Sequence, residues 1–304
     1  MRLSGRKFGI IEVKEKDMSN LTQAQTLSRD ELLQKEPQKI EEPKQNPKTP
    51  QIENPEKKQK ISLEQTAVIF GQSEEDVSKE FREYKALKLF KKFDCDLTQV
   101  KDFEQLKIKI DEAVKFGFGN VVVNPRQIRQ AKRILKGKKI SVFGAVCYPH
   151  GEEVYGVKKY AVKKAFEEGA DGVYLPVGTS DIKCGKIEQV KREFAKIVKR
   201  HKRKKIFAVL EINELDFSLA ERVVKMLVKL RVSGIVSGSG YAISPKAFSG
   251  ASALHSLSGG KRPVIACATS DKSRDVLSLF SVADRVFLKN APKIATDLKA
   301  NLEF

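Results

Sequence analysis

The chain of 304 residues is poor in the residue types that build metal centres and disulfide frameworks. It has no tryptophan, three histidines and four cysteines, and the cysteines lie far apart without a C-x-x-C pair. This excludes a zinc knuckle and a dense disulfide framework, and we expect no metal, no cofactor and reduced thiols. No run approaches the roughly 18 apolar residues of a membrane span, and no signal-peptide stretch opens the chain, so we expect a cytoplasmic protein without a membrane partner.

Charge of one sign is in excess. Lysine and arginine number 58 against 39 aspartates and glutamates, a formal net charge of +19. Only +3 of this falls on the first 60 residues, so the basicity belongs to the remainder of the chain. A strongly basic surface attracts anions but does not specify a fold.

The first 60 residues differ in composition from the rest. Five of the eleven prolines fall there, among Lys, Glu, Gln and Asn. Such a segment buries too little apolar area to offset the loss of backbone entropy, so residues 1–60 are predicted to be a disordered tail. Residues 61–90 follow as a helical lead-in, with Ser62 and Ser73 as helix caps.

From residue 91 onward, short β-branched runs alternate with amphipathic stretches. Counting a first strand near 89–97, eight strands are predicted, the others at 119–124, 140–147, 172–176, 206–212, 234–238, 263–267 and 285–288. The stretch 157–168 is predicted to be a helix with Val157, Ala161 and Ala165 on one face and lysines on the other. Eight such units in residues 91–304 favour an α/β fold, a (β/α)8 TIM barrel, over the alternative of a doubly wound open sheet.

Nucleotide-binding signatures are missing from these units. No G-x-G-x-x-G follows the first strand, and no Walker phosphate loop occurs. Dinucleotide or P-loop nucleotide binding therefore receives little support.

Several short motifs occur in a fixed order. They are Asn124-Pro-Arg, Tyr148-Pro-His-Gly151, Val157-Lys158, Glu168-Gly-Ala-Asp-Gly-Val173, Ile182-Lys-Cys-Gly185, Val209-Leu-Glu-Ile-Asn-Glu-Leu215 and Ser237-Gly-Ser-Gly240. Their succession resembles the deoxyribose-phosphate aldolase family over residues 93–290. The resemblance implies a TIM barrel and an aldol reaction between acetaldehyde and glyceraldehyde 3-phosphate through a lysine Schiff base.

The resemblance also assigns the family's catalytic positions, and this chain departs from each. Val236 stands where the family has the Schiff-base lysine, Tyr174 where it has the proton-shuttling aspartate, and Ile265 where it has the helper lysine. Valine has no lone pair with which to form an imine. No catalytic residue is retained, and we predict an aldolase-like barrel that acts as a non-catalytic binding or regulatory protein.

The family holds its phosphate ester with backbone amides of the loops after the seventh and eighth strands, and the loop after the sixth strand offers further amides in this chain. By resemblance, candidate anion ligands here are Ser237, Gly238, Ser239, Gly240, Thr269 and Lys289. A phosphorylated small molecule is therefore the expected partner.

Other residues admit two interpretations each. The candidate pocket residues are Tyr148, Tyr174, Lys183, Glu211, Val236 and Ile265. Tyr148 and Tyr174 either line a pocket or pack as apolar side chains, and in the second case Tyr174 closes the mouth of the barrel. Lys183 either faces the carboxyl end of the barrel, where the family has its active site, or is a solvated surface lysine. Glu211 either belongs to a structural hydrogen-bond network or takes part in acid–base chemistry.

Two alternative functions stay open. In the first, a displaced lysine, Lys261 or Lys289, keeps aldolase or lyase activity on deoxyribose 5-phosphate or another phosphorylated sugar. In the second, the basic run 199–205 contacts nucleic acid through phosphates, although cations at a helix end also occur as a solvated surface.

Overall fold

The computed structural model describes residues 84–241 and 246–301. Eight parallel strands close into a barrel in sequence order, with β8 paired to β1. The strands are β1 (Phe93–Asp96), β2 (Asn120–Val123), β3 (Ser141–Ala145), β4 (Gly172–Pro176), β5 (Lys205–Val209), β6 (Gly234–Val236), β7 (Val264–Ala268) and β8 (Arg285–Leu288). The predicted (β/α)8 barrel is confirmed.

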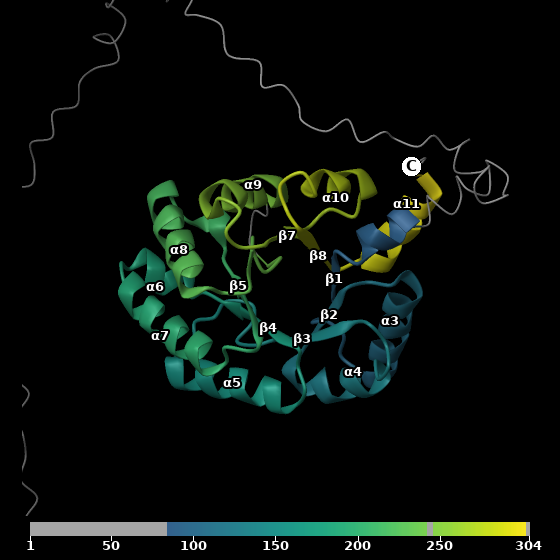
Figure 1. The fold of residues 1–304 in the computed structure, drawn as a ribbon, viewed down its shortest axis with the longest axis horizontal. Helices are drawn as coiled ribbons and strands as arrows, with labels where there is room; N and C mark the ends of the chain where they lie inside the picture. The colour runs from purple at the N-terminus through teal and green to yellow at the C-terminus, as the bar shows by residue number, and fades with distance from the viewer. Residues whose placement is uncertain (1–83, 242–245, 302–304) are drawn as a thin grey trace, which may run out of the picture. The chain divides into compact units, whose positions relative to one another are not determined.

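Helices surround the barrel, as Figure 1 shows. They are α3 (Phe103–Phe116), α4 (Ile128–Ile134), α5 (Tyr155–Glu167), α6 (Thr179–Lys183), α7 (Ile187–Arg200), α8 (Phe217–Leu230), α9 (Ala247–Ser258), α10 (Ser273–Leu279) and α11 (Ala291–Asn301), with short 3-10 turns η1 (Pro125–Gln127) and η2 (Ile212–Glu214). A parallel strand can return only through a crossover, so each strand is followed by at least one helix before the next.

Local sequence signals define where several helices begin and end. The carboxylate of Asp102 accepts a hydrogen bond from the backbone N–H of Gln105 and caps α3, and Gly117, at φ +71°, ends the helix in the left-handed region. Asp216 caps α8 in the same way through the N–H of Leu219. These caps satisfy donors that the helix itself leaves free.

Two predicted details are wrong. Residues 84–90 are helical and 91–92 form a turn, so the first strand is shorter than the predicted span 89–97. On α5 the buried face is Lys158, Val162 and Ala165, whereas Val157 is 51% exposed. The hydrophobic pattern placed Lys158 in solvent, but its ammonium lies 3.7 Å from the carboxylate of Glu193 on α7. A buried charge is tolerated when it is paired, and periodicity alone does not reveal the partner.

Two apolar clusters hold the fold together. The larger lies between the strands and the surrounding helices. The smaller fills the barrel interior with Val122, Phe143, Ala145, Tyr174, Phe207, Val209, Val236, Ile265, Cys267 and Phe287. The Tyr174 ring contacts the rings of Phe287, Phe207 and Phe143 at centroid distances of 5.1, 5.5 and 5.8 Å. The barrel is therefore a packed core rather than a pore.

A polar network lies near the amino ends of the strands. Asp94 on β1 is fully buried, and its carboxylate accepts hydrogen bonds from Asn120 Nδ2 at 2.7 Å and from Tyr174 Oη at 2.6 Å. The guanidinium of Arg285, on β8, also donates to this carboxylate, with Nε at 2.9 Å. The buried carboxylate thus has three partners, as a buried charge requires.

The tail 1–60 and most of the lead-in, including Ser62 and Ser73, lie outside the described residues, so those predictions are untested. Within the described part of the chain, no helix is both long and apolar enough to cross a bilayer.

Candidate functional site

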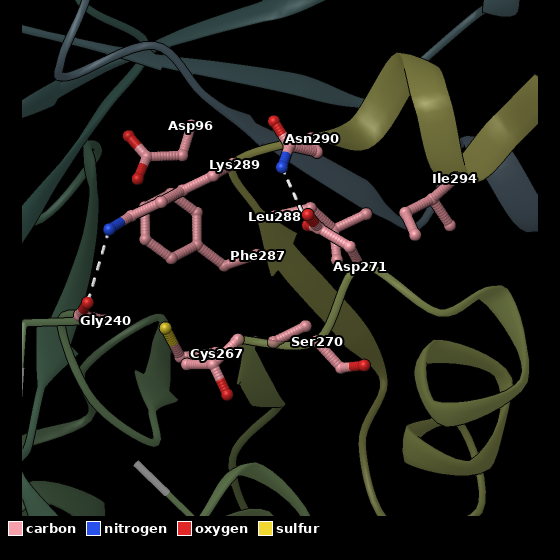
Figure 2. A pocket seen from close by; sticks show the side chains of 12 residues that line it. Asp96, Gly240, Cys267, Ser270, Asp271, Phe287, Leu288, Lys289, Asn290 and Ile294 are labelled. Atoms are coloured by element: carbon pink, nitrogen blue, oxygen red, sulfur yellow. Dashed lines mark hydrogen bonds between the residues drawn. The ribbon is translucent and has the colours of Figure 1, made fainter. Parts of the chain in front are cut away.

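A pocket of about 300 Å³ opens at the carboxyl ends of β1, β7 and β8, beside the loop after β6. Its lining, shown in Figure 2, consists of Asp96, Gly240, Cys267, Ala268, Thr269, Ser270, Asp271, Phe287, Leu288, Lys289, Asn290 and Ile294. Barrel enzymes hold their sites at this end because the strand ends and loops of distant segments converge there.

Asp96, the last residue of β1, is the buried acid of the pocket. Its Oδ1 accepts a hydrogen bond from the backbone N–H of Thr98 at 2.9 Å, while Oδ2 has no partner among the described residues. Burial raises the pKa of Asp96, and the Thr98 amide and the Lys289 ammonium partly oppose this. This oxygen is therefore a buried hydrogen-bond acceptor without a described donor.

Lys289, directly after β8, supplies the cation. Its ammonium donates to the carbonyl oxygen of Gly240 at 3.3 Å and lies 4.4 Å from the centroid of the Tyr241 ring. Asn290 precedes α11 and donates to Asp271 Oδ1 at 2.7 Å. The space beside the Lys289 ammonium and the start of the eleven-residue helix α11 is favourable for an anionic group, because both carry positive charge.

The thiol of Cys267 does not provide a nucleophile. Burial raises its pKa, and the nearby carboxylates of Asp96 and Glu211 raise it further. Burial also raises the pKa of Tyr148. At neutral pH both groups keep their protons, so neither a thiolate nor a phenolate acts here.

Replacing Asp96 by asparagine should stabilise the protein at neutral pH. Because the folded-state pKa of Asp96 is raised, the native state loses stability as the pH rises above 3.8 and through that raised pKa. Asp96→Asn removes this loss, so the free energy of unfolding of the variant should exceed that of the wild type at pH 7. The difference between the two proteins should be smaller at pH 4. Urea titrations at both pH values measure the effect, and a gap that does not change with pH would contradict it.

The matched control is Asp271→Asn in the same pocket. Asp271 is exposed to water, so this change should bring no comparable pH-dependent gain.

The structure brings together the positions that resemblance assigns to the family's two lysines. Val236 on β6 pairs in register with Ile265 on β7, and both side chains are fully buried in the barrel interior. Tyr174 is also fully buried, but its hydroxyl donates to Asp94, in the network near the amino ends of the strands. Tyr174 thus fills the interior of the barrel, deeper than the mouth. None of the three lines the pocket.

The predicted anion-binding loop after β6 is engaged in hydrogen bonds with other segments of the protein. Ser239 donates its N–H to Glu211 Oε1 at 2.7 Å, and its carbonyl accepts from the Tyr148 hydroxyl. Ser237 Oγ accepts from the backbone N–H of Cys267 at 3.0 Å. Of residues 237–240, Gly240 alone lines the pocket, where it joins the predicted Thr269 and Lys289. Glu211 and Tyr148 thus hold the loop in place.

Steric crowding explains why a glycine ends the Tyr148-Pro-His-Gly151 motif. Gly151 adopts φ +67°, and a Cβ there would lie 2.5 Å from the carbonyl oxygen of Pro176 at the end of β4. Only glycine fits this close approach of two loops.

Two lysines of the sequence analysis lie away from the pocket. Lys183 on α6 pairs with Glu214 at 3.2 Å and is largely exposed. Lys261 precedes β7, at the amino end of the barrel, whereas the pocket lies at the carboxyl end. Lys261 therefore does not line this pocket, because a segment that enters a strand lies at the other end of the strand from the site.

Four polar residues line the pocket without having been predicted from the sequence: Asp96, Ser270, Asp271 and Asn290. Asp96 carried a usable signal, since it is a carboxylate at the end of a strand whose ends meet the other strand ends.

Curated relatives share sequence with part of the chain. The deoxyribose-phosphate aldolase of Clostridium botulinum strain Langeland is 33% identical over 126 residues, which are 41% of this chain and 59% of that enzyme. The enzyme of Caldicellulosiruptor saccharolyticus is 27% identical over 142 residues, 46% of this chain and 64% of that enzyme. The chain is related to the deoxyribose-phosphate aldolases. The alignments span about three fifths of these aldolases' lengths, and no family model matches the chain.

Solved structures support the same fold. The deoxyribose-phosphate aldolase of Aeropyrum pernix superposes with a TM-score of 0.66 at 19% identity, covering 76% of this chain and all of that one. An aldolase named QR15 gives a TM-score of 0.66 at 19% identity over 70% of this chain and 96% of its own. At this identity the likeness establishes the barrel of the deoxyribose-phosphate aldolases and not their activity.

Proposed function

We propose that this protein binds a small phosphorylated, hydroxyl-bearing molecule at the carboxyl end of its barrel and does not catalyse the Schiff-base aldol reaction. The observation that carries the proposal is the pair Val236 and Ile265, which fill the barrel interior where the related enzymes by resemblance have their lysines. Without an amine at either position, no imine forms there.

The pocket supports binding through two unlike ends. Asp96 presents a buried, unpartnered carboxylate oxygen that suits a hydroxyl donor. Lys289, beside the start of α11, suits the phosphate. The exposed carboxylate of Asp271 lines the same pocket and accepts a hydrogen bond from Asn290 Nδ2 at 2.7 Å.

The test combines trapping and binding on the full chain. Incubation with acetaldehyde and borohydride should leave no adduct on any barrel lysine by peptide mass spectrometry, under conditions that label an active deoxyribose-phosphate aldolase. Calorimetric titration with deoxyribose 5-phosphate should show binding that is lost when deoxyribose without phosphate is used. An adduct on a barrel lysine, or equal binding of both sugars, would contradict the proposal.

A second candidate function keeps catalysis through Lys289. One observation favours it: among the described residues that line the pocket, Lys289 is the only lysine, and it shares the pocket with the buried acid Asp96. An amine and a proton-transferring carboxyl group are the parts that imine chemistry needs.

Replacing Lys289 by alanine separates the two functions. If the protein only binds, Lys289→Ala should weaken deoxyribose 5-phosphate binding by about 10- to 100-fold, the loss of one charged hydrogen bond worth about 1.5–3 kcal/mol, with no turnover in either protein. If Lys289 is the nucleophile, the wild type cleaves the sugar phosphate and the variant does not. Lys272→Ala, an exposed lysine outside the pocket lining, serves as the control and should leave binding unchanged.

A further inference from the structure

Charge is distributed unequally between the two ends of the barrel. We define the amino face as the segments between each helix and the strand that follows, and the carboxyl face as the segments between each strand and the next α-helix. The amino face carries eleven lysines and arginines and three carboxylates, whereas the carboxyl face carries five and seven. Among these connecting segments, the excess of positive charge thus lies at the end of the barrel opposite the pocket.

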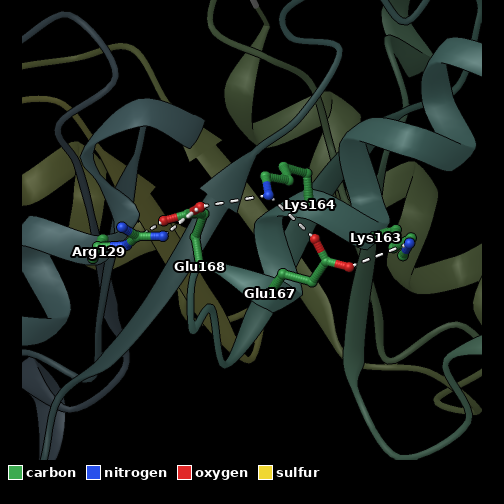
Figure 3. Close-up of polar contacts among 5 residues, drawn as sticks. All are labelled: Arg129, Lys163, Lys164, Glu167 and Glu168. Atoms are coloured by element: carbon green, nitrogen blue, oxygen red, sulfur yellow. Dashed lines mark hydrogen bonds and ion pairs between the residues drawn. The ribbon is translucent and has the colours of Figure 1, made fainter.

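The three carboxylates of the amino face are already engaged. Glu168 binds Arg129 at 2.7 Å and also pairs with Lys164, as Figure 3 shows. Asp171 binds Lys132 at 3.0 Å. Asp284 accepts a hydrogen bond from the backbone N–H of Val264 at 2.8 Å. Glu168 and Asp171 are therefore paired with cations of the helices, and none of the three acids forms an ion pair with a described cation of the amino face.

Six of the cations form an arc across three neighbouring strands. The segments that enter β5, β6 and β7 carry Lys202, Arg203, Lys204, Arg231, Lys261 and Arg262. None of the six forms an ion pair with another described residue; five are exposed and Arg262 is half-buried. Because β5, β6 and β7 are adjacent in the barrel, residues 60 positions apart in the chain share one surface.

The cations of the arc also affect the pKa of a neighbouring histidine, His201. The pKa of His201 is lowered, first by its partial burial and then by the positive charges of Arg200 and Lys204. The ring stands against Phe166, with 5.0 Å between the ring centroids, and is not a free ligand.

We propose that the arc binds the phosphate backbone of a double-stranded nucleic acid. A duplex presents one negative charge about every 1.7 Å along its axis, which suits several unpaired cations on one surface. The three segments contain no Phe, Tyr or Trp for base stacking, so the contacts are to phosphates and independent of base sequence. They also expose no large apolar side chain that could insert into a membrane.

The experiment measures binding of a fluorescent 20-base-pair duplex, as DNA and as RNA, to the full chain by anisotropy over a range of salt concentrations. The test variant is the triple charge reversal Lys202→Glu, Arg203→Glu and Lys204→Glu. The matched control reverses Lys101, Lys246 and Lys272 to glutamate; these exposed lysines of the carboxyl face bring the same change in net charge. Vesicles containing phosphatidylserine form a separate arm.

We expect the duplex to bind at low salt and to be released as salt rises. The arc variant should bind at least tenfold more weakly, and its salt slope should shrink by about 0.9 for each phosphate that the protein no longer neutralises; the control should weaken less than threefold. A glutamine triple at the same three arc positions, checked by circular dichroism, covers the case in which charge reversal disturbs folding, and it should also weaken binding.

Three results would overturn the proposal: no duplex binding at low salt, equal weakening in the arc and control variants, or binding to the vesicles but not to the duplex. The proposal stands independently of the pocket, since Lys289→Ala should leave duplex affinity unchanged.

Discussion

Replacing Asp94 by alanine should lower the free energy of unfolding by about 3–5 kcal/mol, the range for leaving a buried charge without its partner. Asp94 is fully buried and holds Arg285, Asn120 and Tyr174. Burial disfavours the charge on Arg285, and Asp94 outweighs this and raises the pKa of Arg285. Without Asp94 the guanidinium loses that compensation while its side chain stays largely buried, and the Tyr174 hydroxyl loses its acceptor.

Urea denaturation measures this loss, and two variants calibrate it. Asp181→Ala breaks the Asp181–Lys186 pair, whose partners are partly exposed, and should change stability by less than about 1 kcal/mol. Tyr174→Phe removes one hydroxyl from the network and should cost about 1–3 kcal/mol. If Asp94→Ala lowers the free energy of unfolding no more than Asp181→Ala does, the Asp94 network does not stabilise the amino end of the barrel.

Introducing a lysine at position 236 should produce the second large effect. Val236 lies in the apolar interior beside Ile265. Burial of an amine there should lower its pKa by up to about 3–5 units, which corresponds to a loss of stability of about 4–5 kcal/mol at pH 7. Because the folded-state pKa would lie below the unfolded value of about 10.4, the loss should be complete below the lowered pKa and should vanish as the pH approaches about 10.4.

Val236→Met is the matched control, since it adds length without an amine. The difference in unfolding free energy between the lysine and methionine variants should therefore shrink from pH 7 to pH 10. A stability difference that is the same at both pH values would show that the side chain reaches water.

The order of strands and helices followed from local pattern because each unit repeats the same signals. Short β-branched runs such as 120–123 alternate with capped amphipathic helices such as α3, and a parallel strand needs a crossover. Eight such units favour a closed barrel over an open sheet, and the pairing of β8 with β1 confirms closure. The buried face of α5 was predicted wrongly because a hydrophobic pattern assigns every lysine to the exposed face. The pattern contains no information about Glu193 on α7, which pairs with Lys158.

The sequence by itself determined the fold class, the family resemblance and the absence of an amine at positions 236 and 265. Tertiary structure alone decided which side chains share a pocket, because its lining comes from strand ends and loops as far apart in the chain as Asp96 and Lys289. It placed Lys261 at the opposite end of the barrel, engaged Ser237 with Cys267 and Ser239 with Glu211, and brought Asp96 and Lys289 to one pocket. It also gathered the cations of three segments on one face. Periodicity acts along the chain, whereas contacts between distant segments depend on how the barrel closes, and that is set by the packing of all eight strands together.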